Sequence, residues 1–162
     1  MAIAYVNSGQ AYSGSGNGFT SGSFDTSGAD FIVIAAATNS GTYTITDSKS
    51  NAYTARTESS AFFGQRAIRV HYAYNATVGT GHTFTIDGTG NSPGLCILWF
   101  SGVLLTDPYD TSSDVGNGND SASTLQASSV TPSVNDCLVL AGTGKEGGGA
   151  ASIDGGFTIA QQ

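Results

Sequence analysis

Short segments in which apolar and polar residues alternate recur along this chain, with glycine-rich turns between them. Residues 66–75 (RAIRVHYAYN) are the clearest example. Successive side chains of a strand point to opposite faces, so one face of this segment carries Arg69 and His71 and should meet water. The other face should lie in the core and consists of Ile68, Val70, Tyr72 and Tyr74. No window of a dozen residues shows a helical apolar period, and the pattern predicts an all-β fold.

Further strands are predicted on the same grounds. Residues 42–46 (TYTIT) alternate, and the turn DSKSN should return the chain through 52–58 as a hairpin; residues 82–86 (HTFTI) alternate after a turn with two glycines. Three segments are apolar without alternation, which is typical of central strands covered on both faces: 31–37, 95–100 and 137–141. Weaker candidates are 2–6, 124–130 and 157–160. Nine or ten strands favour a two-sheet antiparallel β-sandwich of the jelly-roll type, with a closed barrel as the alternative.

Charge is scarce, because only 10% of the 162 residues are charged. That excludes helical bundles and coiled coils, which depend on charged helix formers, while 39% hydrophobic residues argue against disorder. We expect one domain spanning 1–162. A net charge of −7 argues against a nucleic-acid partner, and no apolar run approaches the roughly 18 residues of a membrane helix.

Two motifs imitate catalytic or nucleotide-binding signatures. Residues 90–94 (GNSPG) match G-x-S-x-G, but Pro93 follows Ser92 and has no N–H for an oxyanion hole, so a hairpin turn is the preferred interpretation. Residues 142–147 (GTGKEG) match G-x-G-x-x-G without a helix to follow. Neither His71 nor His82 has the spacing of a metal ligand, and we interpret both as surface residues. The sequence therefore predicts no enzyme.

The longest polar interruption, residues 106–123, is rich in aspartate. Hard oxygen ligands of this kind suit calcium, and the candidate ligands are Asp107, Asp110, Asp114 and Asp120. No EF-hand spacing is present, and solvated turn residues explain the same letters, so the plain loop is preferred. No other metal or cofactor is expected.

Two aromatic residues are candidates for contact with a partner protein or a sugar ring. Tyr109 lies in the aspartate-rich loop, whereas the apolar neighbours of Trp99 favour a place in the core. Cys96 and Cys137 both stand in apolar runs, which favours buried free thiols over a disulfide between neighbouring strands.

Several segments occur in an order that resembles a β-sandwich module of phage virion proteins and of bacterial surface or secreted proteins. They are ITDSKSNAYTA (45–55), HYAYNATVGTGHTFTI (71–86), LCILWFSGV (95–103), DPYDTSSD (107–114), and SSVTPSVNDCLVLAGTG (128–144) followed by GGFTIAQQ. The resemblance implies structural or adhesive function without catalytic residues. It also implies one or two further C-terminal strands. Without them a sheet edge would stay open for a strand of another chain to pair with. Trp99 departs from the residue pattern of the module.

An absent export signal combined with a robust, weakly charged surface fits a protein released by lysis inside a virus particle. We therefore expect a bacteriophage virion protein (a capsid decoration, head-fibre or tail-fibre domain) that forms homo-oligomers and binds capsid or tail proteins. The alternative is a carbohydrate-binding or adhesion module of a bacterial extracellular protein, with a host glycan as ligand.

Overall fold

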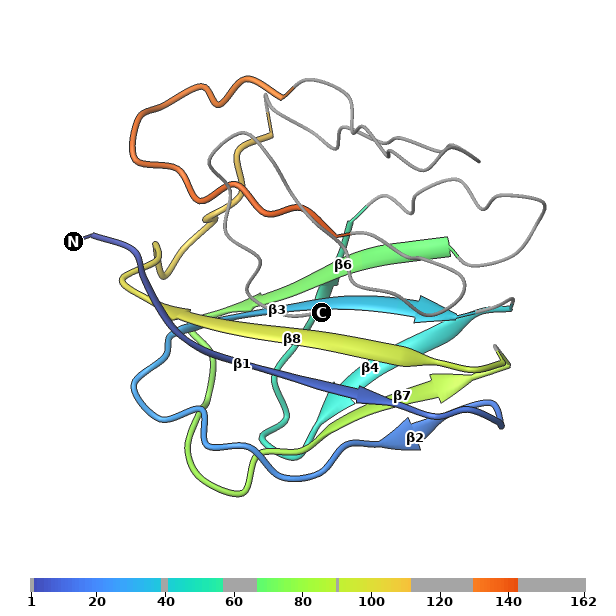
Figure 1. Cartoon of the computed structure of the whole chain (residues 1–162). Coiled ribbons are helices and arrows are strands. Elements are labelled where there is room, and N and C mark those ends of the chain that lie inside the picture. Colours follow the sequence, from blue (N-terminus) through green and yellow to red (C-terminus); the bar gives the residue numbers. More distant parts are fainter. Residues whose placement is uncertain (1, 39–40, 57–66, 90, 112–129, 143–162) are drawn as a thin grey trace.

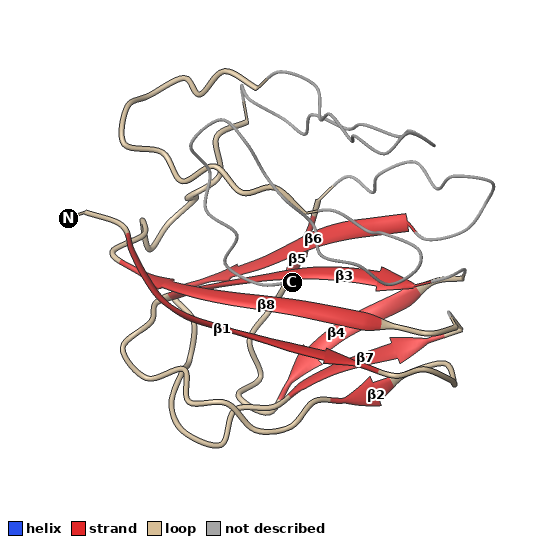
Figure 2. Cartoon of the chain, viewed as in Figure 1, coloured by secondary structure: helices blue, strands red, loops and turns tan. Residues whose placement is uncertain are grey.

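The fold is an all-β sandwich of two antiparallel sheets, seen in a computed structural model that describes residues 2–38, 41–56, 67–89, 91–111 and 130–142 (Figures 1 and 2). The larger sheet has the strand order β1-β8-β3-β6-β5 and the smaller one β2-β7-β4. The strands are β1 (Ala4–Tyr12), β2 (Phe19–Thr20), β3 (Phe31–Thr38), β4 (Tyr43–Asp47), β5 (Thr54–Ala55), β6 (Ala67–Tyr74), β7 (Phe84–Gly88) and β8 (Gly94–Ser101). The predicted fold class is thereby confirmed.

Successive strands from β1 to β4 alternate between the two sheets, and β6, β7 and β8 do the same. The orders β1-β8-β3-β6 and β2-β7-β4 are those of a jelly roll. Only β5 departs from this order, because its two residues pair with β6. The described part of the chain contains no helix, and hence none that could span a bilayer.

The core between the sheets is built on β3 and β8, which are central strands as predicted. Ile32 and Ile34 of β3 face it together with Ile97 and Trp99 of β8, and Phe84 covers them from β7. Trp99 is 1% exposed, which confirms the core interpretation of this residue. Both strands are also covered on their other face, where Phe31, Val33 and Phe100 form a second cluster.

The two faces of β6 lie opposite to the prediction. His71 pairs with Ile34, whose side chain points into the core, and His71 is accordingly only 5% exposed. Val70 and Tyr72 instead pack on the outer cluster. Alternation separates the two faces of a strand but does not reveal which of them a second sheet covers. In β6 the face that carries His71 and Ala73 meets the smaller sheet.

Residues after β8 return over the outer face of the larger sheet. Figure 1 shows 102–111 and 130–142 on the side of that sheet away from β2, β7 and β4. Val103 packs on the outer cluster, and Gly142 lies so close to Ile68 and Ala35 that an added Cβ would sit 3.2 Å and 3.5 Å from their side chains.

Three further predictions about strands were wrong. The turn after β4 leads into β5 of the opposite sheet rather than into a hairpin partner, and the turn around Ser92 likewise connects β7 to β8 of the other sheet. Residues 137–141 form no strand and are exposed, because the interior positions of the larger sheet are occupied by β8, β3 and β6. The candidate 124–130, except for its last residue, and the candidate 157–160 lie outside the described residues. The first strand is longer than expected, running through 4–12 instead of 2–6.

Both cysteines are free thiols, as preferred, but only Cys96 is half-buried. Cys137 is exposed because it belongs to the segment that forms no strand. Its thiol donates to the backbone carbonyl of Val134 at 3.3 Å.

Candidate functional site

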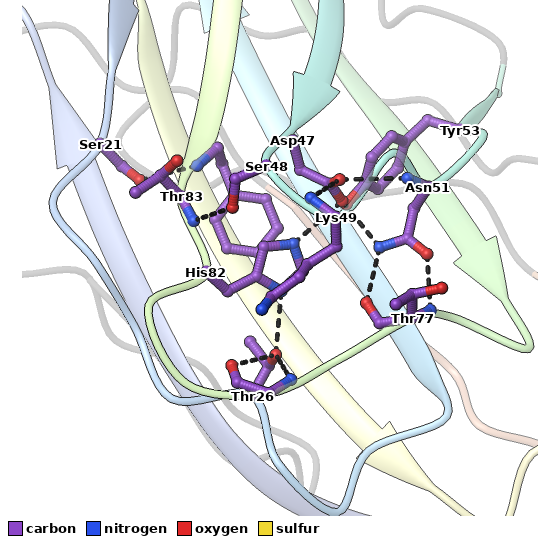
Figure 3. A network of polar contacts seen from close by, with 12 residues as sticks. Ser21, Thr26, Asp47, Ser48, Lys49, Asn51, Tyr53, Thr77, His82 and Thr83 are labelled. Atoms are coloured by element: carbon purple, nitrogen blue, oxygen red, sulfur yellow. Dashed lines mark hydrogen bonds and ion pairs between the residues drawn. The ribbon is translucent and has the colours of Figure 1, made fainter.

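The most densely bonded polar group of the described residues is the carboxylate of Asp47, at the end of β4 (Figure 3). Its Oδ1 accepts the backbone amides of Lys49 at 2.9 Å and Asn51 at 3.1 Å. Its Oδ2 accepts the Tyr53 hydroxyl at 2.6 Å and Asn51 Nδ2 at 2.8 Å. An aspartate that opens a turn commonly caps the amides following it, and Ser50 in this turn adopts φ 63°.

Asn51 ties this turn to the connection between β6 and β7. Its side-chain Oδ1 accepts the amide of Thr77 at 2.7 Å, and its Nδ2 donates to the carbonyl of Thr77 at 2.9 Å. The primary amide thus imitates a strand partner, pairing with both backbone groups of one residue. The turn after β4 and the loop before β7 are held as one unit.

His82 joins the network from the other side. Its Nε2 lies 3.0 Å from Asp47 Oδ2, a close polar contact whose angle is not that of a linear hydrogen bond. Its Nδ1 lies 2.9 Å from the Thr26 hydroxyl, which also accepts the Gly79 amide at 3.1 Å. The imidazole ring stacks on Phe84 with centroids 4.3 Å apart.

Electrostatics favour the ionised form of Asp47. Burial alone would raise the pKa of this carboxyl, but the Tyr53 hydroxyl, both Asn51 donors and His82 outweigh burial and lower the pKa below its ordinary value. Burial and the adjacent carboxylate conversely raise the pKa of Tyr53 far above its usual range. Tyr53 therefore stays a hydrogen-bond donor to a charged acceptor.

Asp47, His82 and Thr26 contact one another in the same series of carboxylate, imidazole and hydroxyl groups as the catalytic triad of a serine hydrolase. The side chains of Asp47 and His82 and the whole of Thr26 are nevertheless 0% exposed. An open depression in the described surface is lined by Thr42–Thr44, Asp87 and Gly88 and does not include this hydroxyl. A substrate has no access, so the arrangement acts as a buried clamp between three loops.

Both histidines were predicted at the surface, and both are buried. His82 became enclosed because its backbone pairs with Phe24 in an isolated bridge that closes one end of the smaller sheet. His71 lies between the sheets, 5.6 Å from the Tyr43 ring. Burial, with a smaller effect of the Arg69 charge, lowers the pKa of His71 to about 4, so it is neutral at pH 7.

Tyr109 lies on the outer face of the larger sheet, where its ring stacks on Tyr72 with centroids 6.0 Å apart. The guanidinium carbon of Arg56 sits 3.6 Å from the Tyr109 centroid, a cation–π contact. Tyr74 continues the row, 6.5 Å from Tyr72, and is exposed. These contacts anchor the segment after β8 to the sheet.

Two of the calcium candidates, Asp107 and Asp110, lie among the described residues. Asp110 accepts both the amide and the hydroxyl of Ser133, at 2.7 Å and 2.9 Å, whereas Asp107 is exposed. Asp114 and Asp120 lie outside the described residues. Among the residues that are described, no three His, Cys, Asp or Glu side chains gather as metal ligands.

Large apolar side chains are exposed where the chain runs outside the sheets. Leu104 is 69% exposed and Val134 is 63% exposed. Leu105, Val130, Leu138, Val139 and Leu140 are also exposed. This apolar surface, together with the edge of β1, is the part of the described molecule best suited to contact another macromolecule.

No family model, no curated protein and no solved structure matches this chain.

Sequence reasoning missed the clamp because its members are distant in the sequence. One signal was present, since Asp47 and Asn51 bracket a five-residue turn of the kind that aspartate caps. The roles of Thr26 and His82 depend on contact across 56 residues, and no local pattern encodes that contact.

Proposed function

We propose that this protein is a structural module of a bacteriophage virion (a capsid decoration, head-fibre or tail-fibre domain) that acts by binding other protein subunits. The observation that carries the proposal is a set of large apolar side chains that are exposed on the two described segments after β8: Leu104, Leu105, Val130, Val134, Leu138, Val139 and Leu140. Monomeric soluble proteins rarely leave contiguous apolar surface uncovered, and a larger patch marks an interaction site.

Two properties of the sandwich support a structural role. The Asp47, His82 and Thr26 side chains at the centre of its most elaborate polar network have no solvent exposure, and they connect loops. The chain also has only 5 Lys and Arg residues, so trypsin-like proteases find few cleavage sites outside the cell. The resemblance of its strand segments to virion modules agrees with both.

The test is to locate the protein in particles. Virions would be purified from a culture that produces the chain and analysed by mass spectrometry and immunogold electron microscopy. We expect the chain in stoichiometric amounts at a fixed position on the particle. Its absence from particles, together with monomeric behaviour of the purified chain, would overturn the proposal.

A second candidate function is carbohydrate binding or adhesion by a bacterial extracellular protein. The row of Tyr74, Tyr72 and Tyr109 favours it, because tyrosine rings on a sheet face can stack on sugars. Arg56 already covers part of Tyr109, which leaves Tyr74 the more open ring. Glycan-array binding that is lost in Tyr109→Ala or Tyr74→Ala, or with a chelator, would favour this function; no binding in the wild type would exclude it for the arrayed sugars.

A further inference from the structure

Strand β1 is a long edge strand whose one protective feature is a bulge near its start. It is 9 residues long (AYVNSGQAY), contains no charged residue and no proline, and pairs on one side with β8. No described strand pairs with its other side. Natural edge strands are normally shortened, charged or interrupted. The other described edges follow that rule in part, since β2 and β5 have only two residues each and β4 ends at the clamped Asp47.

A bulge determines which β1 side chains share the outer face. Tyr5 pairs with Phe100 and Asn7 with Trp99, so Val6 is the extra residue. Beyond the bulge, Gly9 faces the core, where an added Cβ would lie 2.3 Å from the Phe24 ring. The outer face therefore presents, in order, Tyr5, Ser8, Gln10 and Tyr12.

This outer face has its large side chains at its two ends. Tyr12 is 83% exposed and Tyr5 is 51% exposed. The Tyr5 hydroxyl donates to Ser8 Oγ at 2.7 Å, which orients the ring along the strand. Because Val6 is the extra residue of the bulge, Tyr5 takes the place in the pairing with β8 that residue 6 would have in a regular strand. Tyr5 and Tyr12 are therefore the same number of pairing positions from Gly9, on opposite sides of it.

We propose that a second copy of this chain pairs antiparallel with β1 about a twofold axis at Gly9. This register places Tyr12 beside the partner's Tyr5 at one end, and the symmetry repeats the contact at the other end. The larger sheets of the two copies then form one continuous sheet. Each chain has a net charge of −7, but the two β1 strands that meet contain no charged residue, so their pairing brings no like charges together. The inference rests on the proposed assembly function and names its partner as the chain itself.

Analytical ultracentrifugation of the full chain tests whether the dimer forms. We expect a concentration-dependent dimer, and Tyr12→Lys should raise its dissociation constant about tenfold or more, because the aromatic contact occurs twice per dimer. Tyr74→Lys is the matched control: it replaces another exposed tyrosine on the same sheet away from β1 and should leave the constant unchanged. A monomer at all concentrations, or equal effects of the two variants, would overturn the proposal.

Cross-linking tests the register. Tyr5→Cys and Tyr12→Cys would each be made with Cys137→Ser, which removes the exposed native thiol. Laterally opposed strand residues are close enough for a disulfide, so a mixture of the two variants should form an intermolecular disulfide and neither variant alone should do so. Cross-linking of either variant with itself, or none in the mixture, would overturn the register. If the chain is monomeric yet present in virions, the β1 pairing fails while the proposed function stands.

Discussion

Replacing Asp47 by asparagine should destabilise the sandwich strongly while keeping the volume of the side chain. The remaining oxygen can still accept the two backbone amides that bind Oδ1. The new NH₂ group, however, would face Asn51 Nδ2, which can only donate, and the Tyr53 hydroxyl, which would have to change from donor to acceptor. Two hydrogen bonds to a charged, buried acceptor are lost, together about 3–6 kcal/mol, and one neutral bond to the Tyr53 oxygen would recover about 1 kcal/mol at most, so we expect a loss of about 3–5 kcal/mol in the free energy of unfolding.

Urea unfolding followed by tryptophan fluorescence measures this loss, and a thermal scan should show Tm lowered by about 10 °C for a chain of this size. Asp25→Asn is the matched control, since Asp25 is exposed and bonds the amide and side chain of its neighbour Ser27; the Tm of this variant should stay essentially unchanged. A double-mutant cycle with Tyr53→Phe should show strong coupling. A loss below about 1 kcal/mol for Asp47→Asn, or purely additive effects, would refute the clamp as a stabilising unit.

Four other outcomes are expected. His71 binds a proton less readily when folded, so wild-type stability should fall as pH drops from about 6.5 to about 4, and His71→Gln should abolish this phase in pH-dependent urea titrations. Asp47, whose pKa is lowered by folding, should produce a separate loss only below its ordinary value of 3.8, which Asp47→Asn removes. Gly88→Ala would place a Cβ 2.1 Å from a backbone carbonyl and should lower Tm by several degrees, whereas Gly22→Ala, with open space, should not. Trp99→Ala should cost about 3–5 kcal/mol by calorimetry or urea unfolding, because the ring is fully enclosed.

The buried clamp and the exposed edge strand β1 lie in different regions of this molecule. Asp47, Asn51 and His82 hold three loops at one end of the smaller sheet without offering a surface to a ligand. The side chains available to a partner lie instead on β1 and on the segments after β8. The stabilising network and the proposed contact surfaces therefore lie on different parts of the chain.

Local pattern was sufficient to predict the strands that are central to the fold. The unbroken apolar runs at 31–37 and 95–100 become β3 and β8, because only a strand covered on both faces can bury every side chain of such a run. An apolar run alone was not sufficient at 137–141, since a strand also requires an open sheet edge beside it, and these residues lie over the face of the larger sheet (Figure 1). That requirement is not a property of the segment itself.

Period-two alternation by itself determined that β6 has two unlike faces, and composition determined that sheets rather than helices would form. Only the tertiary structure decided that His71 would face the opposite sheet and Tyr72 the returning segment. It also decided that Thr26 and Asp47 would meet His82. The physical reason is that a strand's pleat is a local steric property, whereas burial and ionisation depend on which distant segments pack against each face.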